Sequence, residues 1–326
     1  MDISTTIANI KLESCILNAS GCWCTTEDEL NKLLESGTGA IVSKSSTVET
    51  RQGNPEPRLY INDPYGSINS MGVPNKGFKF YTDYGNNIDE NNKKPFIQSI
   101  LPFSHDDLKQ IISYINDNSK NHKLIELNLS CPNLINKSIV AYDYKTFEEY
   151  LEILDNLKSD KLIFGIKLPP YYHEHEFETV SNLILKFPVI KFVTCINSVV
   201  NGLLIDVENE ETAIHPKNGL GGIGGIYCKP TALANVYQFS KRIGHTVDII
   251  GCGGVNSAMD IFEHILAGAC AVQVGTLLMK KGPGVFHGLN KQLQNIMQIK
   301  EYTNITEFKG KLRNKKTSEK TTEQTA

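Results

Sequence analysis

The segment from Asn128 to Asn133 holds the side chains best suited to chemistry. It reads Asn-Leu-Ser-Cys-Pro-Asn, so that a thiol, Cys131, lies between two carboxamides, and it directly follows the apolar run 124–127. The run predicts a strand, Pro132 prevents that strand from continuing, and Cys131 therefore falls on the loop beyond it. A thiol in that position can attack a substrate, accept a proton or bind a metal. The carboxamides can hold a planar ligand that is rich in amide groups.

Cys131 itself has two interpretations, a general base and an inert buried cysteine. A free thiol has a pKa of about 8.5, which lies within the range useful for a base at neutral pH. The polar neighbours Ser130 and Asn133 favour the base. No Ser-His-Asp constellation emerges from the sequence, and we assign none of the eight histidines to catalysis.

Four polar residues each end an apolar run that predicts a strand: Lys44, Asn128, Lys167 and Asn197. If the strands form a parallel barrel, their carboxyl ends meet at one face, and these side chains surround a single cavity with two positive charges and several amide groups. One such lysine alone is also compatible with a salt-bridged core residue. Two lysines and two asparagines at matching strand ends favour a binding site.

Glycine clusters follow the last two predicted strands. The sequence Gly-Cys-Gly-Gly at 251–254 follows one strand, and Gly-Thr at 275–276 follows the other. The backbone N–H groups of glycines can approach an anion closely, and barrels often bind phosphate with these two loops. Two tight turns are the plainer interpretation of both. A third cluster, residues 219–225, is either a flexible loop or a further backbone contact to the same phosphate.

The cysteines and the overall charge exclude several classes of function. The eight cysteines show no paired CxxC spacing, which argues against a zinc site or an iron–sulfur cluster and favours free thiols in a reducing compartment. A net charge of -3 and a pI near 6.3 give no sign of a nucleic-acid or membrane partner. No apolar run approaches the roughly 20 residues of a membrane helix, and the N-terminus lacks the features of a signal or transit peptide. We therefore expect a cytoplasmic protein.

Apolar runs and amphipathic segments alternate along the chain and predict the elements that position these residues. Helices follow most of the predicted strands, with capping-box chemistry at 25–29 and a helix that opens at Ser104. The segment 46–92 is expected to be rich in turns. The predicted strands are 16–19, 40–44, 95–100, 124–128, 162–167, 192–197, 247–251 and 271–275.

About eight β-then-α units predict an α/β fold, the (β/α)8 TIM barrel. The strands are continuously apolar, which is typical of a parallel sheet that is covered by helices. An open doubly wound sheet is the alternative, but it needs fewer strands, and the chain lacks an early GxGxxG. We expect residues 1–312 to form this single domain, and residues 313–326, which are almost without apolar side chains, to form a disordered tail.

Taken together, the motifs resemble the dihydroorotate dehydrogenase family, specifically its soluble class 1A, over residues 8 to 312. Beyond the motifs named above, the resemblance is carried by Asn-Ala-Ser-Gly at 18–21, Ser-Lys-Ser at 43–45, and the segments 53–58, 67–75, 165–167 and 197–198. It implies a (β/α)8 barrel with non-covalently bound FMN that oxidises (S)-dihydroorotate to orotate in pyrimidine biosynthesis. It also implies that Cys131 removes the C5 proton while C6 delivers hydride to flavin N5. Residues 131 to about 142 would then form a lid that excludes water.

The same resemblance assigns individual residues to the site. It implies that Cys131, Lys44 and Lys167 are catalytic, with Lys167 stabilising the anionic reduced flavin near its N1–C2 edge. The substrate is expected to contact Lys44, Asn69, Met71, Gly72, Val73, Asn128, Asn133, Asn197 and Ser198. The ring and ribityl chain of FMN are expected to contact Ala19, Ser20, Gly21, Lys44, Ser45, Asn128, Lys167 and Ile196. The phosphate of FMN is expected to contact Gly225, Cys252, Gly253, Gly254, Gly275 and Thr276.

The subclass sets the electron acceptor. Residues 67–75 resemble class 1A, which implies a homodimer that reduces fumarate to succinate in the site that orotate has left. Class 1B enzymes instead pair with an iron–sulfur/FAD subunit and use NAD. Class 2 enzymes are membrane-bound and use serine as the base, so Cys131 favours class 1. Four features depart from the family pattern: Val73 in place of a usual leucine, Gln98, residues 101–103 and the region of Trp23.

The residues alone also allow other functions. A Schiff-base aldolase or lyase would use Lys44 or Lys167 as its nucleophile and the glycine loops for a substrate phosphate. A non-catalytic barrel would serve as a binding scaffold. A dihydropyrimidine-reducing relative would share the flavin barrel, but the usual versions carry cluster-binding cysteines that this chain lacks.

Overall fold

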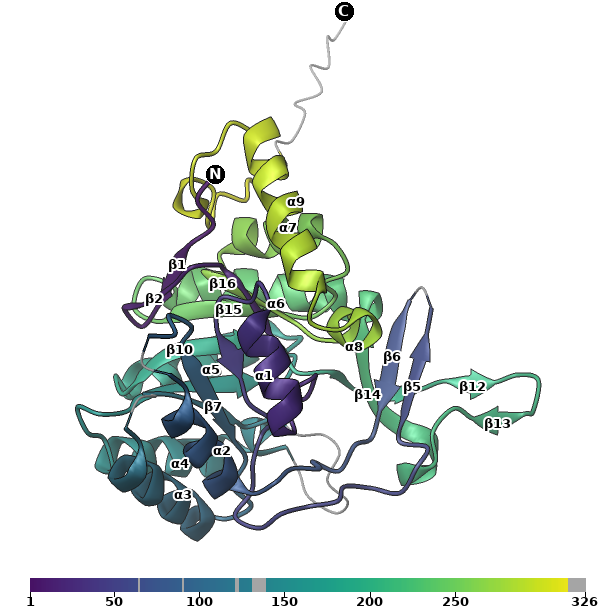
Figure 1. Ribbon diagram of the computed structural model, residues 1–326. Helices are drawn as coiled ribbons and strands as arrows, with labels where there is room; N and C mark the ends of the chain where they lie inside the picture. The colour runs from purple at the N-terminus through teal and green to yellow at the C-terminus, as the bar shows by residue number, and fades with distance from the viewer. Residues whose placement is uncertain (64, 90, 121–122, 131–138, 316–326) are drawn as a thin grey trace, which may run out of the picture.

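A barrel of eight parallel strands forms the centre of the computed structural model, which describes residues 1–63, 65–89, 91–120, 123–130 and 139–315 (Figure 1). Its strands are β3 (Ile16–Asn18), β4 (Ile41–Val42), β7 (Phe96–Ile100), β8 (Leu124–Asn128), β9 (Ile163–Leu168), β10 (Ile190–Cys195), β15 (Asp248–Cys252) and β16 (Ala271–Val274). They pair in the order β3-β16-β15-β10-β9-β8-β7-β4. From β7 onward, each strand therefore pairs with the barrel strand that precedes it in the chain, and β3 and β4 are the two ends of the sheet.

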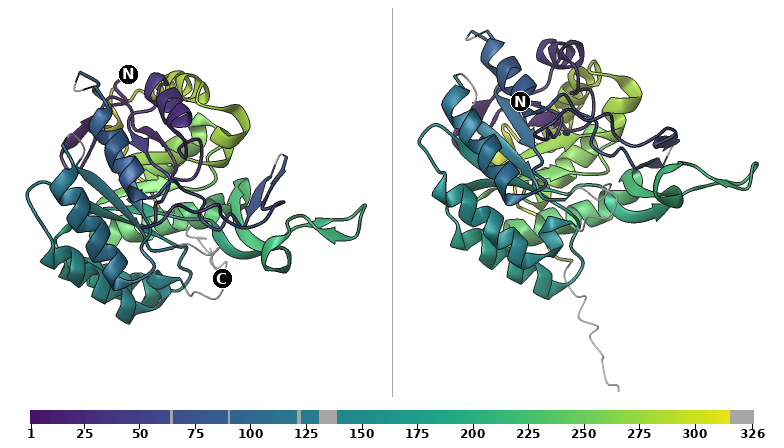
Figure 2. Two further views of the ribbon diagram at one scale, coloured as in Figure 1. Left: turned by 60° about the horizontal axis from the view of Figure 1, so that its bottom comes forward. Right: turned by 90° about the horizontal axis from the view of Figure 1, so that it is seen from below.

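The helices follow the strands in the chain and cover the outside of the barrel (Figure 2). They are α1 (Glu27–Glu35), α2 (Phe78–Asn87), α3 (His105–Asn118), α4 (Tyr144–Asn156), α5 (Glu174–Lys186), α6 (Lys229–Ile243), α7 (Ala258–Ala267), α8 (Thr276–Lys281) and α9 (Val285–Ile299). The α/β barrel predicted from the apolar runs is confirmed, and the open doubly wound sheet is wrong.

The predicted helix starts follow from local capping chemistry. Thr26 precedes α1, and its hydroxyl accepts a hydrogen bond from the Glu29 N–H while the Glu29 carboxylate accepts one from the Thr26 N–H. Ser104 precedes α3, and its hydroxyl accepts a hydrogen bond from the Asp107 N–H. Each cap satisfies backbone donors that the first turn of a helix leaves without a partner.

The barrel has two apolar cores, one around it and one inside it. The larger core lies between the strands and the helices. The smaller one fills the amino-terminal half of the barrel and includes Leu124 and Phe192 from the strands. Ile7 and Leu12 add to it from the hairpin of β1 (Thr5–Ile7) and β2 (Ile10–Leu12). The apolar floor leaves only the carboxyl half of the barrel for polar side chains.

Asn18 joins the two end strands of the sheet. Its side-chain Nδ2 donates to the Val42 carbonyl oxygen at 2.7 Å, and the Val42 N–H donates to its Oδ1 at 2.8 Å. Both residues are fully buried. The carboxamide thus pairs with Val42 as a backbone peptide group would in a ladder, which satisfies a backbone donor and acceptor that water cannot reach.

A second, antiparallel sheet lies beside the carboxyl end of the barrel. Its strands β5 (Leu59–Asn62), β6 (Gly66–Asn69), β11 (Val199–Leu203) and β14 (Leu220–Gly225) pair in the order β11-β14-β6-β5. A hairpin of β12 (Ile205–Asp206) and β13 (Glu211–Thr212) projects beyond it (Figure 2). The short helices η1 (Val140–Tyr142), η2 (Pro216–Gly219), η3 (Ile226–Cys228) and η4 (Ile305–Glu307) complete the described elements.

This sheet bears on two expectations. Most described residues of the segment 46–92 lie outside helices and strands, as expected, but the segment also contains β5, β6 and α2. The interpretation of residues 219–225 as a flexible loop is wrong, because most of them form β14 and pair with β6. A Cβ on Gly66 would lie 2.1 Å from the Gly224 carbonyl oxygen, and one on Gly225 would lie 2.4 Å from the Gly66 Cα. These glycines therefore allow two backbones to approach closely.

Within the described residues, no helix has both the length and the apolar character required to cross a membrane. Residues 316–326 of the expected tail lie outside the described part of the chain.

Replacement of Asn18 by alanine is expected to lower the free energy of unfolding by about 2 to 4 kcal/mol, because it leaves the buried Val42 N–H and carbonyl without partners. Urea unfolding measures the change. The control is Asn256→Ala at an exposed position, where the expected change is within about 0.5 kcal/mol. Equal stability of the two variants would contradict the role of Asn18 in closing the barrel.

Candidate active site

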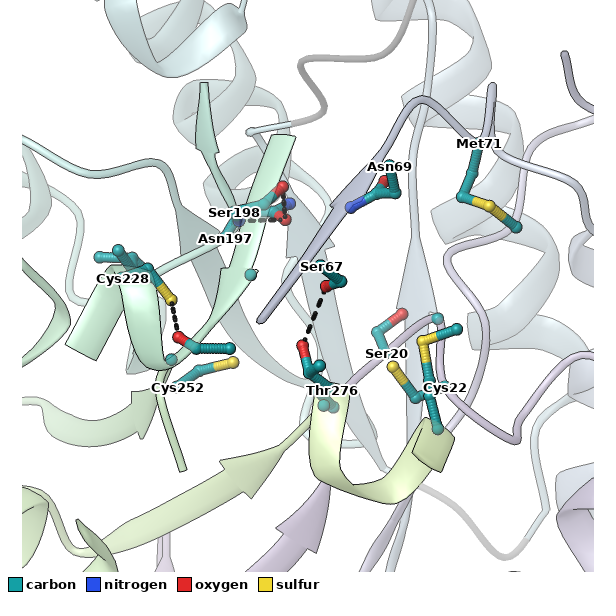
Figure 3. A pocket seen from close by; sticks show the side chains of 18 of the residues that line it. Ser20, Cys22, Ser67, Asn69, Met71, Asn197, Ser198, Cys228, Cys252 and Thr276 are labelled. Carbon is teal, nitrogen blue, oxygen red and sulfur yellow. Dashed lines mark hydrogen bonds between the residues drawn. The ribbon is translucent and has the colours of Figure 1, made fainter. Parts of the chain in front are cut away.

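A pocket opens at the carboxyl end of the barrel, where the strands deliver their last residues (Figure 3). It brings together the four strand-end residues Lys44, Asn128, Lys167 and Asn197. It is also lined by most of the other residues predicted for the site: Ala19, Ser20, Gly21, Ser45, Asn69, Met71, Val73, Ile196, Ser198, Gly225, Cys252, Gly253, Gly254, Gly275 and Thr276.

Three predicted site residues do not appear in this lining. Gly72 lies between two lining residues but packs on the other side of the chain, where a Cβ would lie 2.4 Å from the Asn54 side chain. Cys131 and Asn133, together with most of the expected lid, lie outside the described residues.

Several lining residues were not predicted from the sequence: Cys22, Leu59, Ser67, Gly224, Cys228, Val255 and Met279. Two of them had a detectable signal. Ser67 lies two residues before Asn69 on β6, so both side chains face the same way. Met279 lies one helical turn after Thr276 on α8. Ser67 and Thr276 approach each other across the pocket, with 3.2 Å between their hydroxyl oxygens, and so connect the second sheet to the barrel (Figure 3).

A chain of hydrogen bonds fixes the carboxamides. Asn128 Nδ2 donates to Ser45 Oγ at 3.0 Å, and Asn128 Oδ1 accepts from the N–H and the hydroxyl of Ser130. Asn197 Nδ2 donates to Ser130 Oγ at 3.0 Å. Because donors and acceptors occupy defined positions, the pocket presents an oriented set of amide groups to a planar polar ligand.

Lys44 supplies a cation to the pocket. It is half-buried two residues after the end of β4, and among the described residues the structure gives its Nζ no hydrogen-bond partner. A Cβ on Gly21 would lie 3.1 Å from this Nζ, and Gly21 has a positive φ of +103°. A side chain at position 21 would therefore be strained and would crowd the ammonium. The ammonium is available to an anionic ligand.

Lys167 supplies a second, buried cation. Its Nζ donates to Gln273 Oε1 at 3.0 Å. Burial lowers the pKa of Lys167, but attraction to Cys252 and Glu126 outweighs burial, and the net pKa is raised above its ordinary value. The side chain is therefore protonated at neutral pH. A Schiff-base nucleophile needs the opposite, a lowered pKa, so this lysine does not suit an aldolase.

The glycine loops present backbone to the other end of the pocket. Gly253 and Gly254 follow β15 with positive φ values of +128° and +78°. A Cβ on Gly254 would lie 2.2 Å from the Lys229 Cβ. The loop can adopt this path only with glycine, and its N–H groups can then approach an anion without an intervening side chain.

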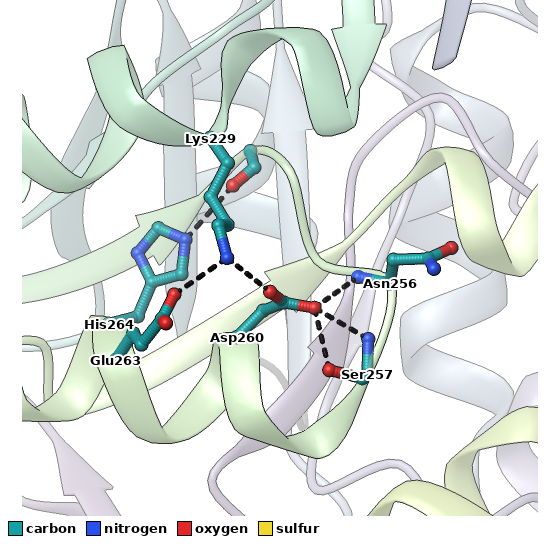
Figure 4. A network of polar contacts seen from close by, with 7 residues as sticks. Lys229, Asn256, Ser257, Asp260, Glu263 and His264 are labelled. Atoms are coloured by element: carbon teal, nitrogen blue, oxygen red, sulfur yellow. Dashed lines mark hydrogen bonds and ion pairs between the residues drawn. The ribbon is translucent and has the colours of Figure 1, made fainter. Parts of the chain in front are cut away.

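A polar network between the start of α6 and α7 lies next to this loop (Figure 4). The Lys229 ammonium pairs with Asp260 at 2.7 Å and with Glu263 at 2.8 Å. Asp260 also accepts hydrogen bonds from the N–H groups of Asn256 and Ser257.

His264, also on α7, holds the loop directly. Its Nε2 donates to the Gly253 carbonyl oxygen at 3.0 Å. Burial lowers the pKa of His264, so the ring is neutral at pH 7. The network and the histidine together anchor both ends of the glycine loop to one helix.

The cysteines of the pocket are protonated thiols at neutral pH. Burial raises the pKa of Cys22 and of Cys228 to about 12 and also raises the pKa of Cys252. Thiols in this state are poor nucleophiles and poor metal ligands. Within the described part of the chain, no group of three or more His, Cys, Asp or Glu side chains could hold a metal ion.

Comparison with known proteins assigns the chain to a family. The family model described as dihydroorotate dehydrogenase matches residues 2–297. A protein of Trypanosoma cruzi named dihydroorotate dehydrogenase (fumarate) is 46% identical over 298 residues, which cover 91% of this chain and 94% of that protein. A relative from Streptococcus agalactiae serotype Ia is 42% identical over 313 residues, 96% of this chain and 99% of that protein.

A solved structure shares the fold. The crystal structure of DHODH from Eimeria tenella in complex with ferulenol superposes with a TM-score of 0.78 over 95% of this chain and 88% of that chain. Its sequence identity of 18% supports a common barrel architecture and nothing finer.

Gly254→Ala is expected to lower the free energy of unfolding by about 2 kcal/mol or more, because alanine is strained at this positive φ and its Cβ overlaps Lys229. Gly288→Ala is the matched control. Gly288 lies inside α9, and no atom lies within 4 Å of the place that a Cβ would occupy, so alanine there should raise the stability by about 0.5 to 1 kcal/mol. Urea titration separates the two, and a neutral Gly254→Ala would refute the tight-loop argument.

Proposed function

This chain belongs to the dihydroorotate dehydrogenase family, and we propose that it oxidises (S)-dihydroorotate to orotate with fumarate as electron acceptor. The observation that carries the proposal is the meeting of Lys44, Lys167 and the strand-end asparagines in one pocket of a chain that matches the family almost throughout. The same reaction is the redox step of pyrimidine biosynthesis. Family membership and the raised pKa of Lys167 both argue against the aldolase alternative.

Enzymes of this family depend on a flavin, and FMN is the flavin proposed here. Three features of the pocket fit it. The glycine loops and Thr276 offer N–H and hydroxyl donors to a phosphate. Hydroxyls of Ser20 and Ser45 line the middle of the pocket. The Lys167 ammonium offers a positive charge to the anionic ring edge of a reduced flavin. When bound, FMN would supply the two-electron acceptor.

The substrate end of the pocket is proposed to be the wall of carboxamides. Orotate presents alternating N–H donors and carbonyl acceptors along its ring edge, which Asn69, Asn128 and Asn197 can match. The Lys44 ammonium, which has no hydrogen-bond partner among the described residues, can pair with the carboxylate of dihydroorotate. Ser198 completes this wall, and its N–H donates to Asn197 Oδ1 at 2.8 Å, which holds the carboxamide in place. Met71 and Val73 supply the apolar side of the substrate site.

Cys131 is proposed as the base that removes the C5 proton of dihydroorotate. Its thiol is far more acidic than a serine hydroxyl, so a larger fraction is in the basic form at neutral pH. The described residue just before it, Ser130, is fully buried and bonded to both Asn128 and Asn197. The chain thus enters the segment of Cys131 from a fixed point beside the proposed substrate.

Fumarate is proposed as the acceptor because the name of the Trypanosoma cruzi relative includes it. Fumarate would enter the site after orotate leaves, since both are planar anions that the same ammonium can hold. A homodimer is also proposed. Support comes from exposed apolar side chains on the projecting hairpin of β12 and β13, where Ile205 is 63% and Val207 is 80% exposed.

Cys131→Ser is expected to slow the reduction of bound flavin by dihydroorotate about 10²- to 10⁴-fold at pH 7, with partial recovery as the pH rises. Anaerobic bleaching of the flavin absorbance in a stopped-flow instrument measures this step. Cys270→Ala, which alters a buried thiol at the amino-terminal end of the barrel, is the control and should keep the wild-type rate. A wild-type rate in Cys131→Ser would remove the base assignment.

A steady-state assay that compares fumarate, a quinone and NAD as oxidants tests the acceptor. We expect fumarate to support the fastest turnover with dihydroorotate. Turnover with NAD alone would overturn the fumarate assignment and point to the class 1B alternative.

A further inference from the structure

Glu126 is a fully buried carboxyl group that the proposed chemistry does not use. It lies on β8 two residues after Leu124 and two residues before Asn128, so all three side chains face the inside of the barrel. Leu124 belongs to the apolar floor, and Asn128 lines the pocket. Glu126 therefore lies at the boundary between the floor and the site.

Only one of the two carboxyl oxygens of Glu126 is hydrogen-bonded among the described residues. Its Oε2 accepts from Thr194 Oγ1 at 2.8 Å and from Gln273 Nε2 at 2.9 Å. Gln273 accepts in turn from the Lys167 ammonium at 3.0 Å. No described residue donates to the buried Oε1. A buried charge with an unfilled acceptor persists only where an opposite charge compensates it.

Four titratable groups contribute to the raised pKa of Lys167: Cys252, Glu126, Cys22 and Cys24. Burial raises the pKa of all three thiols, to about 12 for Cys22 and about 11 for Cys24, so none is charged at neutral pH. Lys44, the other ammonium of the pocket, has the same sign as Lys167. Of the described groups, Glu126 is left as the source of negative charge.

We propose that Glu126 is a positioning residue that holds Lys167 in its protonated form and, through Gln273, fixes the ammonium at the base of the pocket. Because Gln273 lies between Glu126 and Lys167, the two charged groups do not contact each other directly. The ammonium then stays on the ligand side of the apolar core that fills the amino-terminal half of the barrel. The inference deepens the proposed function, because Lys167 is the cation assigned there to the reduced flavin.

Glu126→Gln tests the charge alone. The variant side chain has the same shape, and its amide oxygen can still accept from Thr194 and Gln273. Without the negative charge, burial dominates, and the titration midpoint of Lys167 should fall by at least about one pH unit. The 13Cε resonance of Lys167 in the full-length protein, assigned with Lys167→Met, reports this midpoint, and circular dichroism at each pH verifies the fold.

Thr194→Val is the matched control, because it removes a hydrogen bond to the same carboxyl oxygen but no charge. Its midpoint should stay within about 0.3 pH units of the wild type. An unchanged midpoint in Glu126→Gln would overturn the proposal, since the carboxyl group would then not control the titration of Lys167. An equal shift in both variants would also overturn it, because the effect would then be structural.

A second measurement decides the question even if Glu126→Gln alone does not fold. Lys167→Met should leave the Glu126 charge unpaired, and the double variant Glu126→Gln/Lys167→Met should remove both charges together. We expect the double variant to melt at least about 4 °C above Lys167→Met. A double variant that melts at or below the single one contradicts the pairing.

The dissociation constant of FMN, measured by fluorescence quenching over the same pH range, connects the pair to the ligand. In Glu126→Gln, the dissociation constant of FMN should increase with pH, and the midpoint of this increase should equal the lowered titration midpoint of Lys167. A dissociation constant of FMN whose pH dependence does not match the titration of Lys167 would contradict the proposed role of this pair in cofactor binding. If the wild type binds no FMN, the proposed function fails, while the resonance and the melting temperatures still decide the role of Glu126.

Discussion

The junction between β3 and β4 is the contact on which the ring of strands depends, because no ladder of backbone hydrogen bonds joins these two strands in the described part of the chain. The Asn18 carboxamide replaces the ladder by pairing with both polar groups of Val42. Two residues further on, the Ser20 hydroxyl donates to the Ser43 carbonyl and accepts from the Ser45 N–H. These side-chain bonds fix the chain on either side of Lys44, so the closure of the barrel and the placement of one active-site cation have the same cause.

The interior of the barrel is divided by polarity along its axis. Apolar side chains fill the amino-terminal half, and a layer that contains Glu126, Thr194 and Gln273 separates them from the pocket. Water is excluded from this layer, so the attraction between its charges is stronger than it would be at the surface. A buried ammonium such as Lys167 can keep its proton there only with a compensating charge nearby. The charge of the pocket thus depends partly on residues, such as Glu126, that are not part of its lining.

Sequence patterns predicted the elements and residues whose signal is local. The strand ends at Lys44, Asn128 and Lys167 were predictable because an apolar run stops at or beside each polar residue. β14 was not, because glycines disfavour a strand and are required here only by the approach of β6, which is distant in sequence. Glu126 was hidden for a related reason. It lies within an apolar run, and the run does not reveal which of its residues face the barrel interior. The roles assigned to individual site residues, including Cys131, stay predictions.

The pairing of β3 with β16 has a consequence for biosynthesis. The first strand of the barrel finds this neighbour near the far end of the chain, where Ile16 pairs with Val272, and the pocket draws its lining from Ala19 to Met279. A polypeptide still emerging from the ribosome lacks β16 and the loop that follows it until residues 271–276 have been synthesised. The ring can close only after β16 has left the ribosome, so the complete pocket can bind a ligand only after these residues have been synthesised. Until then, the edges of β3 and β15 that pair with β16 in the finished barrel have no partner strand from this chain.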